Sequence, residues 1–195
     1  MQTLIKAFEF ASIKHKDQRR KDPSKSPYIN HPIQVASLLS QAGVTDPEII
    51  SAGILHDTIE DTKTTYEELV KEFGPNIANM VMECTDDKSL PKITRKQHQI
   101  THALTISQGA KLVKLADKYA NLSDIRTNPP TSWSQKEIEG YVVWAYVVCK
   151  GLEKTNEFLE NKLMEIFKSY QVDKLNKDEL DAKLIDYYLS IADKD

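Results

Sequence analysis

The stretch "GILHDTIEDT", residues 53–62, places a histidine, two aspartates and a glutamate within six positions, directly after an apolar run. If the segment is helical, residues four apart share a face. His56 then lies above Glu60, and Asp57 lies above Asp61. Burying four ionisable groups so close together is costly unless a cation neutralises the carboxylates. The stretch therefore predicts a buried helix that holds a divalent cation beneath a cleft.

Apolar residues recur at helical spacing along almost the whole chain, and no alternating apolar–polar stretch indicates a sheet. The expected helices cover residues 1–18, 30–43, 45–57, 64–73, 76–84, 92–105, 108–123, 134–150, 153–169 and 176–191. Side chains that can cap helix starts are Asn30, Thr45, Thr64, Ser134 and Asn176. The pattern predicts an all-α fold.

Composition indicates a folded chain in a reducing compartment. The 195 residues carry a net charge of −3, which gives no global attraction to nucleic acid or to an anionic membrane. No apolar run approaches the roughly 20 residues that span a bilayer, and residues 1–6 do not resemble a signal peptide. Cys84 and Cys149 stand apart in apolar helical surroundings and are expected to be free thiols. We expect a cytoplasmic protein with no nucleic-acid or membrane partner.

The last 25 residues are rich in charge, yet they keep a helical pattern. Their apolar side chains fall on one stripe, formed by Leu180, Leu184, Tyr187 and Ile191, and Asn176 with Glu179 can form a capping box. We expect one additional helix, docked on the body of the protein or on another subunit. A flexible tail is the alternative.

Two further residues can join the acidic cluster. His31, in "YINHP", stands at the start of an expected helix, and Asp117 stands in the middle of the apolar helix "KLVKLADKYANL". A lone buried aspartate is strongly disfavoured without a partner. A salt bridge from Asp117 to Lys114 or Lys118 is one explanation, and a bound metal ion is the other.

Together, His31, His56, Asp57 and Asp117 would form a shell of two imidazoles and two carboxylates from three separate helices. Such a donor set suits Mn, Fe or Zn, whereas a cage made only of oxygens would suit Mg or Ca. The plainer interpretation is a solvated acidic helix end, with His56 packed against its neighbours.

Four segments, "PYINHPIQVA", "HDTIEDT", "ECTDDKSLPK" and "AKLVKLADKYANL", resemble the HD superfamily of metal-dependent phosphohydrolases. More narrowly, they are similar to the hydrolase domain of RelA/SpoT-type alarmone enzymes, in particular the single-domain small alarmone hydrolases of the metazoan SpoT-homologue type. The resemblance implies an HD-domain bundle of about eight to ten helices over residues 1–171. An appended helix over residues 172–195 has no counterpart in the core pattern.

The resemblance also implies an activity and a set of site residues. The activity is removal of pyrophosphate from the ribose 3′ position of (p)ppGpp, giving GDP or GTP. One Mn²⁺ would be held by His31, His56, Asp57 and Asp117. The resemblance assigns a catalytic role to Glu60 and Asp61, which would position or activate the attacking water. It also implies that the nucleotide is bound by Arg20, Lys21, Lys92, Asn121 and Tyr141.

Two other functions remain open at this point. The same site could act as a phosphatase on the 2′-phosphate of NADPH, or the fold could serve as a nucleotide sensor without turnover. A sensor has no need for the carboxylate pair Glu60 and Asp61, which favours an enzyme. The chain could be a monomer or a homodimer. Three other histidines are expected outside the site: His98 and His102 in surface or packing roles, and His15 in support of the basic loop "QRRKDPSKSPYIN", residues 18–30.

Overall fold

The computed structural model describes residues 1–192 and contains, over that range, eleven α-helices, one 3₁₀ turn and no β-strand. The prediction of an all-α fold is confirmed. The helices are α1 (Gln2–Lys14), α2 (Asn30–Gln41), α3 (Pro47–Leu55), α4 (Thr58–Asp61), α5 (Tyr66–Phe73), α6 (Pro75–Cys84), α7 (Lys92–His102), α8 (Gln108–Thr127), α9 (Gln135–Lys150), α10 (Glu157–Ser169) and α11 (Lys177–Ile191), with the 3₁₀ turn η1 (Val172–Lys174) before α11.

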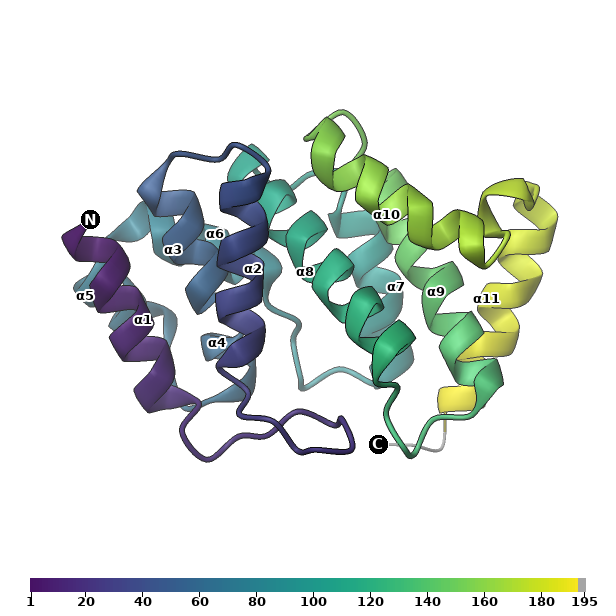
Figure 1. Cartoon of the computed structure of the whole chain (residues 1–195), viewed down its shortest axis with the longest axis horizontal. Coiled ribbons are helices and arrows are strands. Elements are labelled where there is room, and N and C mark those ends of the chain that lie inside the picture. The colour runs from purple at the N-terminus through teal and green to yellow at the C-terminus, as the bar shows by residue number, and fades with distance from the viewer. Residues whose placement is uncertain (193–195) are drawn as a thin grey trace.

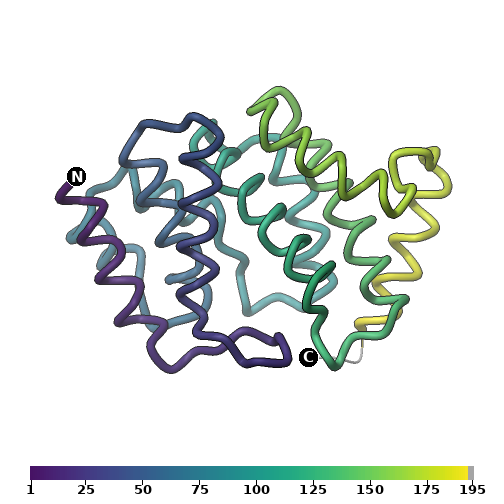
Figure 2. The backbone as a smooth tube through the Cα atoms, in the orientation of Figure 1, coloured from purple at the N-terminus to yellow at the C-terminus, as the bar shows by residue number. Residues whose placement is uncertain are grey.

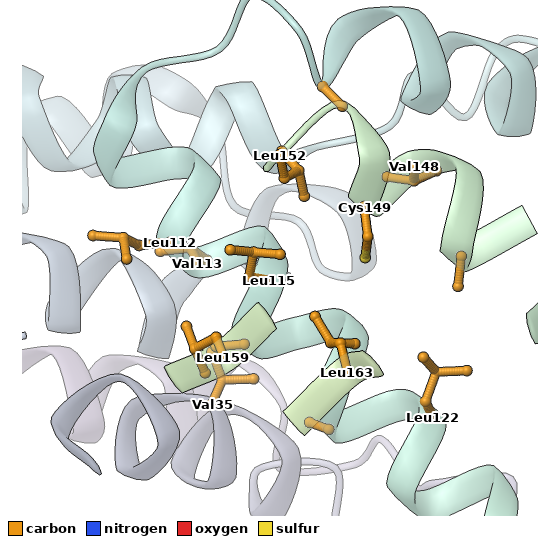
Figure 3. Packing of buried hydrophobic residues seen from close by; sticks show 14 of the residues in the cluster. Val35, Leu112, Val113, Leu115, Leu122, Val148, Cys149, Leu152, Leu159 and Leu163 are labelled. Carbon is orange, nitrogen blue, oxygen red and sulfur yellow. The ribbon is translucent and has the colours of Figure 1, made fainter. Parts of the chain in front are cut away.

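Helix α8 crosses the middle of the molecule, with α1–α6 on one side and α9–α11 on the other (Figure 1). It packs against α2, α3, α6, α9 and α10. Its apolar side chains meet those of α2 and α10 in the core shown in Figure 3, where the labelled residues include Val35, Leu115, Leu159 and Leu163. A helix surrounded in this way is buried along most of its length, which brings Asp117 into the interior.

The opening stretch is not one continuous helix. Helix α3 ends at Leu55, and the next helix, α4, begins only at Thr58. The hydroxyl of Thr58 donates to the carbonyl oxygen of Leu55 at 2.6 Å, which satisfies a carbonyl at the end of α3. The helix expected over residues 45–57 therefore ends two residues early, and His56 and Asp57 form the turn between α3 and α4.

Some predicted helix starts are confirmed and others are displaced by one residue. Ser134 and Asn176 both form complete capping boxes. Asp46 caps α3 in place of Thr45, because its carboxylate accepts the backbone N–H of Glu48. Thr65 likewise caps α5 in place of Thr64, the residue predicted there.

Helices α2 and α10 also begin at residues that differ from the prediction. Helix α2 includes Asn30, which we expected to cap it, and Ile29 stands at the N-cap. Helix α10 begins at Glu157 instead of residue 153, because the Asn156 side chain accepts the backbone N–H of Leu159.

Cys84 and Cys149 are free thiols, as predicted. Within residues 1–192, no helix is long and apolar enough to cross a bilayer.

Helix α11 lies alongside α9, and the two helices pack directly together (Figure 1). Its side chains Leu184, Tyr187 and Ile191 are buried. This segment is therefore a helix docked on the body, and not a flexible tail. The division into a domain over residues 1–171 and an appended unit over residues 172–195 stays a prediction, and residues 193–195 lie outside the described residues.

Candidate metal centre and substrate cleft

Three parts of the fold bring His31, His56 and Asp117 together. His31 lies in the first turn of α2, His56 in the turn after α3, and Asp117 in the middle of α8. Their ligand atoms all lie within 4.8 Å of one another. The Oδ1 atom of Asp117 is 3.1 Å from His31 Nε2 and 3.6 Å from His56 Nε2. These three side chains form a candidate metal site.

Asp57 borders the same site. Its Oδ2 atom lies 3.0 Å from His56 Nε2 and 3.7 Å from His31 Nε2. The Tyr28 hydroxyl donates a hydrogen bond of 2.5 Å to this oxygen. Burial, together with the Asp57 charge, raises the Tyr28 pKa well above its usual value, so the hydroxyl stays protonated and keeps donating. Tyr28 therefore orients Asp57, a role that the sequence did not indicate.

The orientation of His56 fits a metal ligand. Its Nδ1 atom lies 2.8 Å from the Gly53 carbonyl oxygen, so Nδ1 donates its proton there and Nε2 faces the cluster, where it could bind a cation. Although buried, Nε2 has no well-aligned hydrogen bond within the described part of the chain. Burial opposes a positive charge on His56, but Asp57 and Asp117 outweigh burial and raise its pKa. The negative charges of Asp57 and Asp117 thus favour a cation beside His56 Nε2.

The candidate site opens into a cleft of about 800 Å³. His56, Asp57 and Asp117 lie in its wall, together with Glu60 and Asp61 from α4. Cationic residues line other parts of the cleft: Lys21, Lys88, Lys92, Arg95, Lys96, Lys114 and Lys118. Aromatic rings line the remainder: Tyr28, Trp133, Tyr141, Trp144 and Tyr187. A cleft with this lining can hold a ligand that has both phosphates and a flat ring.

Glu60 and Asp61 lie in different environments. Glu60 accepts a hydrogen bond of 2.9 Å from the backbone N–H of Asp86. Burial, then the charges of Asp86 and Asp57, raise the pKa of Glu60 to about 7. Asp61 accepts hydrogen bonds from Gln18 Nε2 at 2.9 Å and from Lys88 Nζ at 2.5 Å. Glu60 is thus able to exchange a proton near neutral pH, whereas Asp61 is tied to neighbouring side chains.

Lys96 and Lys118 both line the cleft, although the sequence analysis did not mention Lys96 and considered Lys118 only as an ion-pair partner of Asp117. Lys96 Nζ lies 3.4 Å from the centroid of the Trp144 ring. Within residues 1–192 no carboxylate lies within ion-pair distance of Lys96, and burial, then the charge of Lys118, lower its pKa to about 7. Lys118 pairs with Asp117 Oδ2 at 3.1 Å. The spacing of four between Lys92 and Lys96 could have indicated a shared basic face on α7.

Arg20 and Asn121 link the basic loop to the metal site. Figure 2 shows the loop between α1 and α2 running beneath α2 toward the C-terminal end of α8. There, Arg20 Nη2 contacts Asn121 Oδ1 at 3.1 Å and Asp124 Oδ2 at 2.6 Å. Asn121 in turn donates to Asp117 Oδ1 at 2.6 Å. Arg20 lines a smaller adjoining pocket of about 390 Å³ instead of the main cleft.

The other residues predicted to bind nucleotide lie at the cleft. Lys92 lines the main cleft, and Lys21, Asn121 and Tyr141 line both the cleft and the adjoining pocket. Tyr141 is buried on α9, and burial raises its pKa to about 12. The hydroxyl therefore stays protonated at neutral pH.

The remaining histidines lie outside the metal site. His15 is buried, and its Nδ1 atom lies 2.6 Å from Gln18 Oε1, so it supports the basic loop as predicted. His98 and His102 are exposed on α7, and the metal-ligand group found in residues 1–192 does not include them. Their exposure agrees with the surface or packing roles expected for them.

The HD domain family matches residues 7–148 of the chain. A Xenopus tropicalis protein named guanosine-3′,5′-bis(diphosphate) 3′-pyrophosphohydrolase MESH1 is 52% identical over 165 residues, which is 84% of this chain and 92% of that protein. The Homo sapiens protein of the same name is 50% identical over 166 residues, 85% of this chain and 93% of that one.

A solved structure has the same fold. It is described as a metazoan ortholog of SpoT that hydrolyzes ppGpp and plays a role in starvation responses. It matches with a TM-score of 0.86 and 45% identity, over 88% of this chain and 97% of that one. The chain belongs to the HD domain family, in the group that contains the MESH1 pyrophosphohydrolases.

Proposed function

We propose that this protein hydrolyses (p)ppGpp at the ribose 3′ position, releasing pyrophosphate and leaving GDP or GTP. Relatives of about 50% identity, aligned over 84% of the chain, are named for this activity. The observation that carries the proposal is the convergence of His31, His56 and Asp117, two of which, His56 and Asp117, lie in the wall of a cleft that also contains Glu60 and a set of lysines.

We propose Mn²⁺ as the metal ion, held by His31, His56, Asp57 and Asp117. Two imidazoles and two carboxylates are donors that Mn²⁺ accepts, and the free Nε2 of His56 faces the position where a cation would lie. When bound, the ion supplies a water of lowered pKa and polarises a phosphoryl oxygen. Tyr28 and the Gly53 carbonyl keep Asp57 and His56 in orientation.

Glu60 is the proposed general base. Its pKa of about 7 means that the carboxylate is available to take a proton from water near neutral pH. The Asp86 N–H fixes one of its oxygens, which leaves the other to face the cleft. Asp61 has a positioning role, because its bonds to Gln18 and Lys88 tie the basic loop to the cleft wall.

The cationic wall would bind the phosphates of the substrate. In the step, the water oxygen bonds to the phosphorus attached to O3′, the bond from that phosphorus to O3′ breaks, and O3′ takes up a proton. Pyrophosphate leaves with the oxygen from water. Lys92 and Lys96 on α7, with Lys21 on the basic loop, are the proposed partners of these charges.

Arg20, Asn121 and Tyr141 would hold the nucleoside part of the substrate. Arg20 suits stacking on a base as well as pairing with phosphate. Its guanidinium forms an ion pair with Asp124 and lies 5.7 Å from the centroid of the Tyr28 ring. The bond from Asn121 to Asp117 connects this end of the site to the metal ligands.

The test is Mn²⁺-dependent release of pyrophosphate from ppGpp by the purified chain. We expect turnover by the wild type, a loss of about 100-fold or more in Glu60→Gln because general acid–base catalysis typically contributes 10²–10⁴-fold, and no change in Glu165→Gln, an exposed control on α10. Phosphate release from NADPH in parallel would reveal the alternative phosphatase. Tight ppGpp binding without turnover would contradict the proposal and identify a sensor.

A cytoplasmic location and the choice between monomer and homodimer stay predictions. Cell fractionation tests the first. Sedimentation of the purified chain over a range of concentrations tests the second, because a homodimer dissociates on dilution with a Kd that the measurement gives.

A further inference from the structure

The C-terminal helix α11 reaches the substrate cleft. Tyr187 and Ile191 line the main cleft, in the same cavity as the metal-site residues His56 and Asp117. Both side chains come from the segment after residue 171, which the resemblance to alarmone hydrolases does not cover. The helix is therefore part of the site by position, although no predicted site residue lies on it.

The position of Tyr187 is fixed by a close approach between α9 and α11. A Cβ atom added to Gly140 on α9 would lie 2.5 Å from Tyr187 Cδ2 and 2.8 Å from its Cβ and Cγ atoms. Glycine is unfavourable inside a helix by about 1 kcal/mol relative to alanine, so the residue has a packing reason to be here. Gly140 lets the Tyr187 ring rest on the backbone of α9, directly before Tyr141.

The lining around Tyr187 is mainly aromatic, with Lys96 Nζ 4.8 Å from the centroid of the Tyr141 ring and Glu137 also in the cleft wall. The Trp133 and Tyr141 rings lie with centroids 5.4 Å apart, and the Tyr141 and Trp144 rings lie 5.2 Å apart. Tyr187 and Ile191 add a ring and an apolar side chain to this wall. Phosphates bind to cations, which the cleft presents from α7 and α8, whereas a flat neutral ring binds to aromatic side chains.

The Tyr187 hydroxyl can serve as a hydrogen-bond donor. Burial raises its pKa well above the usual value, so it remains protonated at neutral pH. Within residues 1–192 this hydroxyl makes no hydrogen bond to another side chain, and Tyr187 lies in the wall of the cleft. A nucleobase bears carbonyl and ring-nitrogen acceptors that such a donor can reach.

We propose that α11 completes the nucleobase-binding end of the cleft and that Tyr187 is a specificity-determining residue there. The ring of Tyr187 contacts the base and its hydroxyl donates to it, while Ile191 excludes water from the same side. The proposal rests on the proposed function for the identity of the substrate. It assigns to residues 177–191 a part in binding, and no part in the chemistry at the metal.

The experiment compares three variants of the full chain. Tyr187→Leu removes the ring, Tyr187→Phe removes only the hydroxyl and keeps the packing on Gly140, and Leu189→Ala is the control. Leu189 lies on the same helix but is 69% exposed, on the solvent side. For each we measure kcat and KM for ppGpp, and the inhibition constant of pyrophosphate, which probes the metal and phosphate end alone.

We expect Tyr187→Leu to raise KM about tenfold and Tyr187→Phe about threefold, with kcat within about twofold of the wild type, since stacking of a base on an aromatic ring contributes to binding more than to the chemical step. The inhibition constant of pyrophosphate should not change, and Leu189→Ala should match the wild type. An unchanged KM in Tyr187→Leu would overturn the proposal. So would a pyrophosphate inhibition constant that rises in step with KM, because it would mean that α11 only supports the fold.

The two proposals can fail separately. A wild-type chain that does not hydrolyse ppGpp with Mn²⁺ contradicts the proposed function alone. Calorimetric titration of ppGpp into the wild type and Tyr187→Phe then gives the same comparison at equilibrium. Weaker binding by the variant supports the role of α11, and equal binding contradicts it.

Discussion

The two carboxylate oxygens of Asp117 have different partners. Oδ1 faces His31 and accepts the amide of Asn121, whereas Oδ2 pairs with Lys118. The two explanations offered for this residue by the sequence, a metal ligand and a salt-bridge partner, are therefore compatible, because each would use a different oxygen. Lys118 holds the pKa of Asp117 well below its usual value against the opposing effect of burial, so the carboxylate stays ionised and able to bind a cation.

The raised pKa of Glu60 gives a prediction about the pH dependence of activity. The general base must be ionised, so kcat/KM should fall as the pH drops below about 7, and a bound cation will shift this midpoint downward because it favours the carboxylate. Rates measured from pH 5 to 9 with saturating Mn²⁺ provide the check. Glu60→Gln should show a low rate without this acidic limb.

The control for this experiment is metal content. Protonation of the histidine ligands would also lower the rate in acid, so bound Mn²⁺ is quantified at each pH. An acidic limb that persists in Glu60→Gln while the metal is retained would exclude Glu60 as its source.

Lys96 gives two predictions, one for substrate binding and one for the pH dependence of the free energy of unfolding. Lys96→Met removes a cation from the phosphate-binding wall, so KM for ppGpp should rise about tenfold or more, since hydrogen bonds to charged groups contribute about 1.5–3 kcal/mol. The folded-state pKa of about 7 lies below the usual 10.5. Between these values the unfolded chain binds more protons, so the free energy of unfolding of the wild type should increase with pH.

Lys96→Met should lose that increase between pH 7 and 10, as measured by urea unfolding at each pH. The matched control is Lys162→Met, because Lys162 also lies over aromatic rings, Tyr119 and Phe158, but outside the cleft. A KM change in the control equal to that in Lys96→Met would contradict a specific role for Lys96.

At the scale of elements, periodicity predicted the helices better than it predicted their ends. The start at Ser134 was predictable because Glu137 completes its capping box. Thr45 and Asp46 are adjacent residues that can both cap, and Pro47 at the first helical position marks Asp46 as the N-cap. The turn at His56 contains no glycine or proline, so nothing in the local sequence distinguishes it from a continuing helix.

The contact between α9 and α11 predicts the effect of a small substitution. Gly140→Ala places a methyl group against Tyr187, and we expect a loss of about 1–3 kcal/mol in the free energy of unfolding, as for other overpacked sites. Lys136→Ala is the control, since Lys136 is exposed on the same helix. Urea denaturation measures both. Stabilisation by Gly140→Ala would show that the helices are not this close.

At the scale of the whole molecule, the metal site joins parts of the chain that are far apart in sequence. His31 and Asp117 are 86 residues apart, yet their ligand atoms lie 3.1 Å from each other. A bound cation would therefore crosslink α2, the turn after α3, and α8. The unfolded chain does not preserve this arrangement, so metal binding should stabilise the folded state.

We expect Mn²⁺ at 100 times its Kd to add about 2.7 kcal/mol to the free energy of unfolding. In a protein of this size, that raises Tm by about 5–10 °C. Differential scanning fluorimetry with Mn²⁺, Zn²⁺, Mg²⁺ and Ca²⁺ measures the shift, and Asp117→Asn should abolish it. Equal shifts for Mg²⁺ and Ca²⁺ would contradict a site that selects imidazole-binding metals.

The parts of the site differ in how far the sequence could predict them. The metal-site residues were predictable because ionisable groups in apolar helices need a partner, and Asp117 and His56 both stand in such surroundings. Lys96 was not, because "KITRKQHQITH" has the composition of a solvated helix. The position of Tyr187 in the cleft depends on how α11 packs against α9, and no local pattern records that contact.

The close approach at Gly140 also constrains how this protein can diverge. Any descendant that keeps an aromatic side chain at position 187 must keep glycine at position 140, because a larger residue would collide with the ring. A lineage that drops the last helix is released from this restriction and can accept alanine or serine there. The two positions should consequently change together, which a survey of homologous genes can score without any knowledge of the substrate.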